Sequence, residues 1–524
     1  MSPTLTMGSR VNGARKPAPK SKAKTLQLRK WRGLNLTDAR TGIDDDELAW
    51  NENAITIGNG YIQILPAVGT AIATVAAGIA SMFGITLNGN AYTLTVNSDG
   101  SMTQVSIPGG VSTVVCVAGT VTTSAHVTMY QSVRALIVDP TKGYFSWDGT
   151  TFAVIDATKT GQSIAVFEGR VFIGNNRTLT YTAPNTYNDF TAGNGAGTTT
   201  ITDESFPGNI IALQSALEQM WIMGQGAIDA LSNVTASGTA PNVVTTFSIT
   251  NIIAGIGSNA PTSVIGYLRS LAFAAPFAFY ALAGVTPQKL SDKLDGLFVN
   301  LTFSDAPASV AIVQNLPCLL FLATYTGSNL QSQVSVSGNT PVILGFTQGK
   351  WFLAVQNTAL KWITTVLVGG VSQCWGTDGA NGNIFQAFGA SASTPVTYKI
   401  QTKLYDDGDA TWMKAITKLG FEFQSANSVS PTVTIDSEFT NQNVALTAVN
   451  TLQLQNAVLA NLQLQNAALA NLTIVSQGTV MSRQGAAMFG RYFGATIAGT
   501  DAPYRIQAIQ FEVTRTTQWS APPP

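Results

Sequence analysis

Residues 84–107 read GITLNGNAYTLTVNSDGSMTQVSI, and this stretch decides the fold class. Its β-branched and aromatic residues form short runs bounded by Asn, Gly and Asp, which is typical of strands. Asn88-Gly89 is a two-residue hairpin turn, because both residue types tolerate positive φ. A second turn at residues 98–100 leads into a third strand from Met102 to Ile107. The stretch therefore predicts a small antiparallel meander.

The same pattern recurs along the chain. ALIV at 135–138 leads to YFSW at 144–147, and Asp148-Gly149 then turns the chain into FAVI at 152–155. Later units begin near residues 171, 220, 271, 319 and 366, so that successive starts lie roughly 35 to 50 residues apart. Stacking small sheets around an axis at this spacing is typical of propeller blades. We predict an all-β fold with a β-propeller of six or seven blades over residues 76–396; a set of β-sandwiches is the alternative.

The pattern of apolar and polar residues changes after residue 397. YKIQTK at 398–403, GFEFQ at 420–424 and IQAIQFEV at 506–513 alternate between apolar and polar residues, which is typical of half-exposed antiparallel sheet. Residues 397–524 are therefore predicted to form a separate β-sandwich or platform domain. It carries an insert at 451–472 with a tandem decapeptide, TLQLQNAVLA and NLQLQNAALA. Leu-Gln alternation in the insert favours strand, whereas its Ala and Leu content favours helix.

The composition excludes several classes of protein. Of 524 residues, 45% are hydrophobic and 11% are charged, and the net charge is zero, which excludes a disordered chain. Three cysteines, Cys116, Cys318 and Cys374, are too few for a disulfide scaffold and are predicted to be buried small hydrophobes. A His-rich metal enzyme is excluded because His126 is the single histidine.

Positive charge is concentrated at the N-terminus. Residues 1–37 hold nine Lys or Arg and no Asp or Glu, which leaves a net charge of −9 on the other residues. We predict an extended basic arm over residues 1–40, followed by a strand segment at 41–75 that joins the platform. Such an arm can bind nucleic acid or an acidic partner surface; a solvated tail is the alternative. The predicted partner-binding residues are Arg10, Arg15, Lys16, Lys20, Lys22, Lys24, Arg29, Lys30 and Arg32.

One uncharged stretch is long enough to span a membrane. Residues 67–87 read AVGTAIATVAAGIASMFGITL. They are rich in Gly, Ala and Thr, and the alternation at 71–75 favours buried strands over a helix. We therefore expect no stable membrane insertion. The first 30 residues also lack the apolar run of a secretory signal.

Residues with catalytic chemistry are scarce. His126 has no motif around it, and neither a GxGxxG loop nor a P-loop is present. Acidic residues cluster at 44–47 and 406–409. The second cluster loosely resembles the start of a calcium loop, but no Glu follows at the position of the bidentate ligand, so a turn is predicted. We predict no enzyme activity and no catalytic, cofactor or metal site.

Several motifs resemble, in the same order along the chain, the tail nozzle or hub proteins of short-tailed bacteriophages, including the packaged-DNA stabilisation type. They are RGLN (32–35), AWNENA (49–54), GYIQILP (60–66), FEGRVFIG (167–174), YTAPN (181–185) with Asp189-Phe190, Ala227-Ile228 after Met220-Trp221, FYAL (279–282) before KLS (289–291), and GRYFG (490–494). The long basic arm and the decapeptide insert depart from the family pattern.

The resemblance implies a structural protein of the virion tail, made in the host cytoplasm. It implies a homo-oligomeric ring, typically a hexamer, below the portal and its head-to-tail adaptor protein. The propeller would lie outside a tube, and the platform would dock to the adaptor. Such a ring retains packaged DNA, forms the channel for its ejection with transient contacts to the DNA, can carry tail fibre or needle proteins, and implies no catalysis or cofactor.

Two further expectations follow. The decapeptide insert is a candidate for the lumen or gate of the tube, through Gln453, Gln455, Asn456, Gln463, Gln465 and Asn466. The alternative function is that of a receptor-binding or glycan-degrading β-propeller tail protein, whose hydrolytic form requires a pair of carboxylates across a pocket. A cellular surface protein is disfavoured, because it would need a signal peptide.

Overall fold

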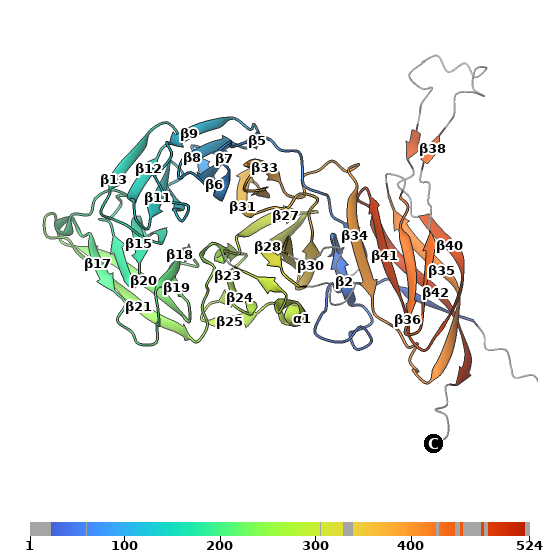
Figure 1. Ribbon diagram of the computed structural model, residues 1–524. Helices are drawn as coiled ribbons and strands as arrows, with labels where there is room; N and C mark the ends of the chain where they lie inside the picture. Colours follow the sequence, from blue (N-terminus) through green and yellow to red (C-terminus); the bar gives the residue numbers. More distant parts are fainter. Residues whose placement is uncertain are drawn as a thin grey trace, which may run out of the picture.

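The computed structural model describes residues 23–58, 60–303, 305–327, 339–425, 429–445, 451–453, 473–475 and 480–518. Their strands form a β-propeller beside a β-sandwich (Figure 1). Within these residues helix is confined to single turns: η1 (Ala192–Asn194), η2 (Pro261–Ser263), η3 (Asp292–Leu294) and α1 (Asp295–Phe298). The predicted all-β fold with a propeller is confirmed.

Seven four-stranded antiparallel blades are present in the described residues. Blade 1 contains β6 (Ile79–Leu87), β7 (Asn90–Asn97), β8 (Met102–Ser106) and β9 (Ser112–Cys116). Blade 2 contains β10 (His126–Tyr130), β11 (Arg134–Asp139), β12 (Gly143–Trp147) and β13 (Phe152–Asp156). Blade 3 contains β14 (Ser163–Phe167), β15 (Arg170–Asn175), β16 (Thr178–Tyr181) and β17 (Gly197–Thr200).

The other four blades follow in chain order. Blade 4 contains β18 (Ile210–Ala216), β19 (Gln219–Gly224), β20 (Ala227–Ser237) and β21 (Val244–Ala254). Blade 5 contains β22 (Ile265–Tyr267), β23 (Ser270–Ala275), β24 (Ala278–Ala283) and β25 (Thr286–Lys289). Blade 6 contains β27 (Ala308–Val313), β28 (Leu316–Tyr325), β29 (Thr340–Thr347) and β30 (Lys350–Ala354), with β26 (Leu301–Thr302) beside β28. Blade 7 contains β31 (Trp362–Val368), β32 (Val371–Thr377), β33 (Asn383–Gln386) and β5 (Ala73–Thr74).

The hairpin that decides the fold class has the predicted geometry. Asn88 and Gly89 have φ values of 50° and 80°, and Leu87 pairs with Asn90 across the turn. Val96 then pairs with Met102 across the second predicted turn. The stretch forms the first three strands of blade 1.

A strand that precedes the first blade in the sequence closes the ring. β5 pairs with β33, so that Ala73 lies opposite Ile384. The amides of Ile72 and Val75 donate to the carbonyl oxygens of Ile384 and Gly382, at 3.0 and 2.8 Å. Blade 7 therefore takes its outermost strand from the opposite end of the propeller sequence.

The C-terminal sandwich consists of two sheets. The distal sheet, which lies farther from the propeller in Figure 1, contains β3 (Ala54–Ile57), β4 (Tyr61–Ile64), β42 (Arg505–Gln518), β35 (Trp412–Gln424) and β40 (Val480–Gly490), with β1 (Lys24–Leu28) also paired to β42. The proximal sheet contains β2 (Leu48–Glu52), β34 (Val396–Thr402), β41 (Phe493–Asp501), β36 (Thr432–Ser437) and β37 (Asn441–Ala445). Buried aromatic residues such as Phe421 and Phe493 fill the space between them.

The propeller and the sandwich share one sheet. β30 of blade 6 pairs in parallel with β2, with Glu52 opposite Leu353, and β2 pairs antiparallel with β34. Blade 6 and the proximal sheet thus form a continuous ten-stranded sheet with the flanking strand β26. The two bodies are joined by hydrogen-bonded strands as well as by the chain.

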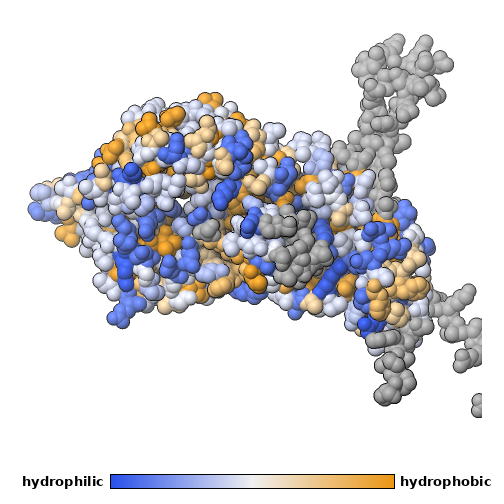
Figure 2. Space-filling model, in the orientation of Figure 1, coloured by the Kyte–Doolittle hydropathy of each residue, from blue (hydrophilic) through white to orange (hydrophobic). Residues whose placement is uncertain are grey.

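Apolar residues are dispersed over the face of the molecule seen in Figure 2. Figure 2 shows small hydrophobic and hydrophilic patches interspersed over the visible face, as is normal for folded proteins. The uncharged stretch at 67–87 contains β5 and β6, as expected. In the described part of the chain, no helix has the length and hydrophobicity needed to cross a membrane.

Candidate functional site: the axial channel

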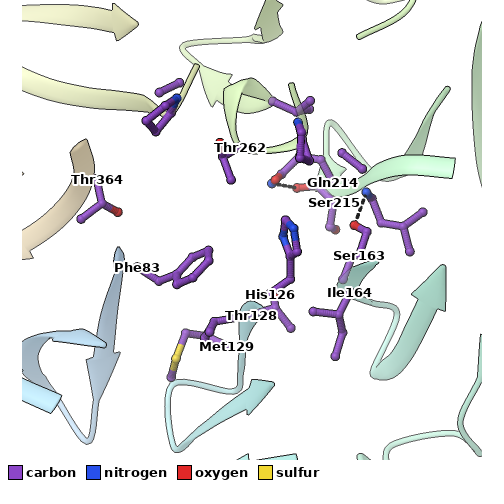
Figure 3. A pocket seen from close by; sticks show the side chains of 18 of the residues that line it. Phe83, His126, Thr128, Met129, Ser163, Ile164, Gln214, Ser215, Thr262 and Thr364 are labelled. Carbon is purple, nitrogen blue, oxygen red and sulfur yellow. Dashed lines mark hydrogen bonds between the residues drawn. The ribbon is translucent and has the colours of Figure 1, made fainter. Parts of the chain in front are cut away.

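The first strands of the blades surround an axial channel with a volume of about 250 Å³ (Figure 3). All seven blades contribute, through β6, β10, β14, β18, β27 and β31 and through residues 261–264 ahead of β22. The polar side chains that line it include Thr128, Ser163, Gln214, Ser215, Thr262 and Thr364. Phe83 and Trp362 supply aromatic rings 6.3 Å apart.

The lining of the channel carries no Asp, Glu, Lys, Arg, Cys or Tyr. His126 is its one titratable side chain, and its ring lies 6.2 Å from that of Phe83. Burial disfavours the charged imidazolium and lowers the pKa of His126 to about 4. The channel therefore presents an uncharged mixture of hydroxyl, amide, imidazole and apolar groups at neutral pH.

Hydroxyl groups join the first strands of neighbouring blades. The Leu213 amide donates to Ser163 Oγ at 2.7 Å between blades 4 and 3. Thr364 Oγ1 accepts from the Gly84 amide at 2.9 Å, which connects blades 7 and 1. Thr365 Oγ1 accepts from the Val310 amide at 2.8 Å. These contacts satisfy polar groups along edges that each small sheet leaves unpaired.

Blades 1 and 7 approach each other closely at Gly84. A Cβ atom at this position would overlap the carbonyl oxygen of Thr365. The φ of Gly84 is not positive, so its backbone conformation would allow other residues. Glycine is required here because a side chain has no space. The sequence pattern predicts a strand that starts at Gly84, whereas β6 already begins at Ile79, and the pattern gives no sign of this inter-blade contact.

The acidic cluster at 406–409 forms the predicted turn. The Gly408 amide donates to Asp406 Oδ1 at 2.9 Å. The buried ammonium group of Lys414 lies beside this turn and donates to the carbonyl oxygens of Asp409 and Arg491, each at 2.7 Å. Burial lowers the pKa of Lys414. A side chain of the protein itself therefore occupies the place where a loop of carbonyl groups could hold a cation.

The acidic cluster at 44–47 takes part in internal ion pairs. Glu47 Oε1 lies 2.6 Å from Lys293 Nζ, and Asp45 Oδ1 lies 2.9 Å from Lys403 Nζ. The described residues contain no group of three or more His, Cys, Asp or Glu side chains that could hold a metal ion. Cys116, Cys318 and Cys374 are buried and unbridged, as expected, and burial raises the pKa of each thiol.

The described part of the basic arm contacts the sandwich of its own chain. Lys24 pairs with Asp407 at 2.6 Å, and Arg29 with Glu422 at 3.0 Å. Arg32 lies 2.8 Å from Asp46, and Lys30 is exposed. The other predicted arm residues, Arg10, Arg15, Lys16, Lys20 and Lys22, lie outside the described residues.

The decapeptide insert is described only at its base. Gln453 ends β38 (Thr451–Gln453), which pairs with β39 (Thr473–Val475). The other gate candidates, Gln455, Asn456, Gln463, Gln465 and Asn466, lie outside the described residues. A role of this insert in a gate stays a prediction.

A buried arginine connects the FEGRVFIG and YTAPN motifs. Arg170 is only 2% exposed. Its guanidinium donates to the carbonyl oxygens of Thr182 and Gly195, both at 2.8 Å, and to the Thr245 hydroxyl at 2.9 Å. Arg170 thereby ties the long connection after β16 to β21 of the next blade. Sequence reasoning missed this role, although a lone Arg at the start of an apolar strand is the signal that points to it.

Comparisons with known proteins give a likeness in fold. No protein-family model and no curated protein matches the chain. The structure of U3-55K is similar at 10% identity and a TM-score of 0.38, over 61% of this chain and 98% of that one. The structure of the RRP9 WD40 repeats is similar at 10% identity and a TM-score of 0.38, over 62% of this chain and 99% of that one. The structure of BBS1N in complex with ARL6DN is similar at 8% identity and a TM-score of 0.37, over 62% of this chain and 96% of that one. At these scores the likenesses carry no functional argument, and the propeller follows from the blades themselves.

Proposed function

We propose that this protein is a structural component of a virion tail, forming a ring-shaped nozzle or hub below the portal and adaptor of a short-tailed bacteriophage. In this role it retains packaged DNA and forms the channel for its ejection. The order of the sequence motifs supports the proposal.

The continuous ten-stranded sheet is the observation that carries the proposal. It couples the propeller to the sandwich through β30, β2 and β34. At this junction Asn53 Nδ2 donates to the carbonyl oxygens of Val355 and Thr397, both at 2.7 Å. Such a joint resists relative motion of two bodies, which suits a building block of a load-bearing wall.

DNA cannot pass through the axis of a propeller. The axial channel has a volume of about 250 Å³, whereas a sphere as wide as the major groove of a duplex, about 12 Å, already encloses roughly 900 Å³. A conduit for DNA must therefore lie between several copies of the chain, and the proposal requires a homo-oligomer, which we expect to be a hexamer. Its neighbours would be the adaptor and tail fibre or needle proteins.

The chemistry of the channel supports a passive role. Hydrolysis of a glycan by the common mechanism needs two carboxyl groups about 5 to 9.5 Å apart, and the channel lining has none. The receptor-binding alternative retains one supporting feature. Phe83, Gln214 and Ser215 offer an aromatic face with amide and hydroxyl groups, a combination suited to a neutral ligand.

Electron microscopy of the purified full-length protein and of virions tests the proposal. We expect a six-fold ring whose subunits each carry one propeller, located at the tail. A monomeric protein that binds a neutral glycan in the axial channel would favour the receptor-binding alternative. A ring found away from the tail would contradict both.

A further inference from the structure

We propose that the solvent-facing side of the distal sheet binds the phosphate backbone of double-stranded DNA, an inference that rests on the proposed function and names the surface involved. We call this side the distal face. Its charged residues are Arg29, Lys418, Glu422, Arg483, Arg505 and Glu512.

Strand alternation defines the distal face. Leu419, Phe421 and Phe423 of β35 are buried in the sandwich core, so Lys418, Gly420 and Glu422 project to the other side. In β42, Ile509 and Phe511 belong to the core. Gln510 and Glu512 therefore share the distal face.

The register of the strands aligns donor groups across the sheet. Gln510 of β42 lies opposite Gln27 of β1 on one side and Gly420 of β35 on the other. Gly420 in turn lies opposite Arg483 of β40. Because Gly420 has no side chain, a shallow cavity of about 110 Å³ remains between Lys418, Arg483 and Gln510. Thr25 and Glu512 complete the lining, so that guanidinium, ammonium, amide and hydroxyl groups surround one small hollow together with a single carboxylate.

The cations on this face are placed for exchange with a phosphate. Arg29 pairs with Glu422 at 3.0 Å and Lys418 with Glu512 at 2.9 Å, and the two cationic side chains are 57% and 58% exposed. Ion pairs as exposed as these are weak, so a phosphate oxygen can compete with the carboxylate. Arg505 Nε donates to Gln63 Oε1 at 2.8 Å. The Arg505 guanidinium also lies over the ring of Tyr61, 4.9 Å from its centre.

Charge distinguishes the distal face from the propeller. The face carries four cationic and two acidic side chains, whereas residues 76–396 contain ten basic and fourteen acidic residues. The chain also enters this sheet at β1 directly after residues 1–22, which contain five basic residues and no acidic one. A polyanion is the occupant that this distribution favours.

The chemistry of the donors defines the mode of binding. Arg, Lys and Gln side chains on the face of a sheet contact phosphate and sugar groups without reading the base sequence. Neighbouring acidic side chains keep the net attraction small. We therefore expect weak, sequence-independent and salt-sensitive binding, as suits a wall past which DNA must move.

Fluorescence anisotropy with a labelled 20-base-pair duplex tests the inference on the full-length protein. The test variant is Lys418→Gln with Arg483→Gln, both on exposed positions. The matched control is Lys142→Gln with Arg269→Gln, which removes two exposed cations from the propeller. We expect at least fivefold weaker binding at low salt for the test pair, a salt slope smaller by about one to two, and no change for the control.

A third variant separates the face from the arm. It replaces Arg10, Arg15, Lys16, Lys20 and Lys22 with Gln. If this variant loses DNA binding while the Lys418/Arg483 pair binds as the wild type does, the inference is overturned. Equal weakening by the test and control pairs also overturns it, because binding would then follow overall charge.

The outcome is distinguishable from that of the proposed function. DNA binding that depends on Lys418 and Arg483, without a ring at the virion tail, would support the distal face and contradict the nozzle. A tail ring whose subunits bind DNA independently of these residues would support the nozzle and contradict DNA binding by the distal face.

Discussion

Gly84 lies where the first and last blades meet, and its missing side chain sets their distance. The carbonyl group of Thr365 occupies the space that a Cβ would need, while the Gly84 amide donates to Thr364. One residue thus permits both the contact and the hydrogen bond that close the ring.

Gly84→Ala is expected to destabilise the protein by about 1–3 kcal/mol, because backbone must shift to relieve the overlap. Chemical unfolding measures the loss. Gly266→Ala is the matched control, since Gly266 also lies in a first strand, β22, and a Cβ there meets nothing within 4 Å. Equal effects of the two substitutions would show that glycine itself, and not the ring contact, sets the cost.

His126 makes stability depend on pH in a defined window. Its pKa falls from 6.5 to about 4 on folding, so below pH 6.5 the unfolded chain binds the proton more readily. This contribution to stability is complete above pH 6.5 and decreases as the pH falls towards 4.

The single imidazole resonance in NMR should therefore titrate with a midpoint near pH 4, and His126→Asn should flatten the pH dependence of unfolding between pH 6.5 and 4. At about 1.4 kcal/mol per unit of pKa, the effect is on the order of 1–3 kcal/mol. A midpoint near 6.5 would mean that the channel is open to bulk water at this point.

At the scale of the element, the sequence predicts second strands better than first strands. The apolar runs at 171–173, 220–223, 271–273 and 319–322 belong to β15, β19, β23 and β28, which are the second strands of their blades, whereas the run near 366 belongs to the first strand β31. A second strand lies between two strands and has neighbouring blades on both faces, so it is almost wholly buried. First strands face the channel, and their mixed composition weakens the signal.

Other elements leave no readable pattern. β5 has two residues, and its partner β33 lies some three hundred residues further along the chain. No local preference distinguishes such a strand from a loop. The neutral character of the channel was nevertheless foreseeable, because the chain has one histidine and few charges.

Arg170 illustrates how one side chain fixes an irregular element. The connection between β16 and β17 has little regular structure, and the guanidinium holds it through the carbonyl groups of Thr182 and Gly195. Arg170→Met should cost about 2–3 kcal/mol, because buried carbonyl groups lose their donor. Thermal unfolding checks this against Arg269→Met, an exposed turn position. A loss no larger than in the control would show that water replaces the guanidinium.

At the scale of the whole molecule, the pairing of strands that joins the propeller to the sandwich could not be predicted from the sequence. The pairing of Glu52 with Leu353 joins residues three hundred positions apart through a single parallel bridge. Asn53 reinforces it, accepting from the Val355 amide at 2.8 Å besides its two donated bonds.

Asn53→Gly removes these three contacts but tolerates the φ of 54° at this position. We expect calorimetry to resolve two unfolding transitions in this variant where the wild type shows one, because the coupling between the two bodies is weakened. Asn53→Ala should lower stability further through backbone strain. A single transition shifted as a whole would show that the strands alone maintain the coupling.

The order of strands in the sandwich has a consequence for biosynthesis. β1 to β4 leave the ribosome early, yet β1 and β4 pair with β42, which begins at Arg505. At about 5–20 residues per second, β1 and β4 lack their partner strand for on the order of tens of seconds during translation. The propeller can close during that interval, whereas a nascent chain interrupted before residue 505 exposes unpaired strand edges. Only chains translated through β42 would present a finished sandwich, so truncated products should be diverted to chaperones and proteases before assembly.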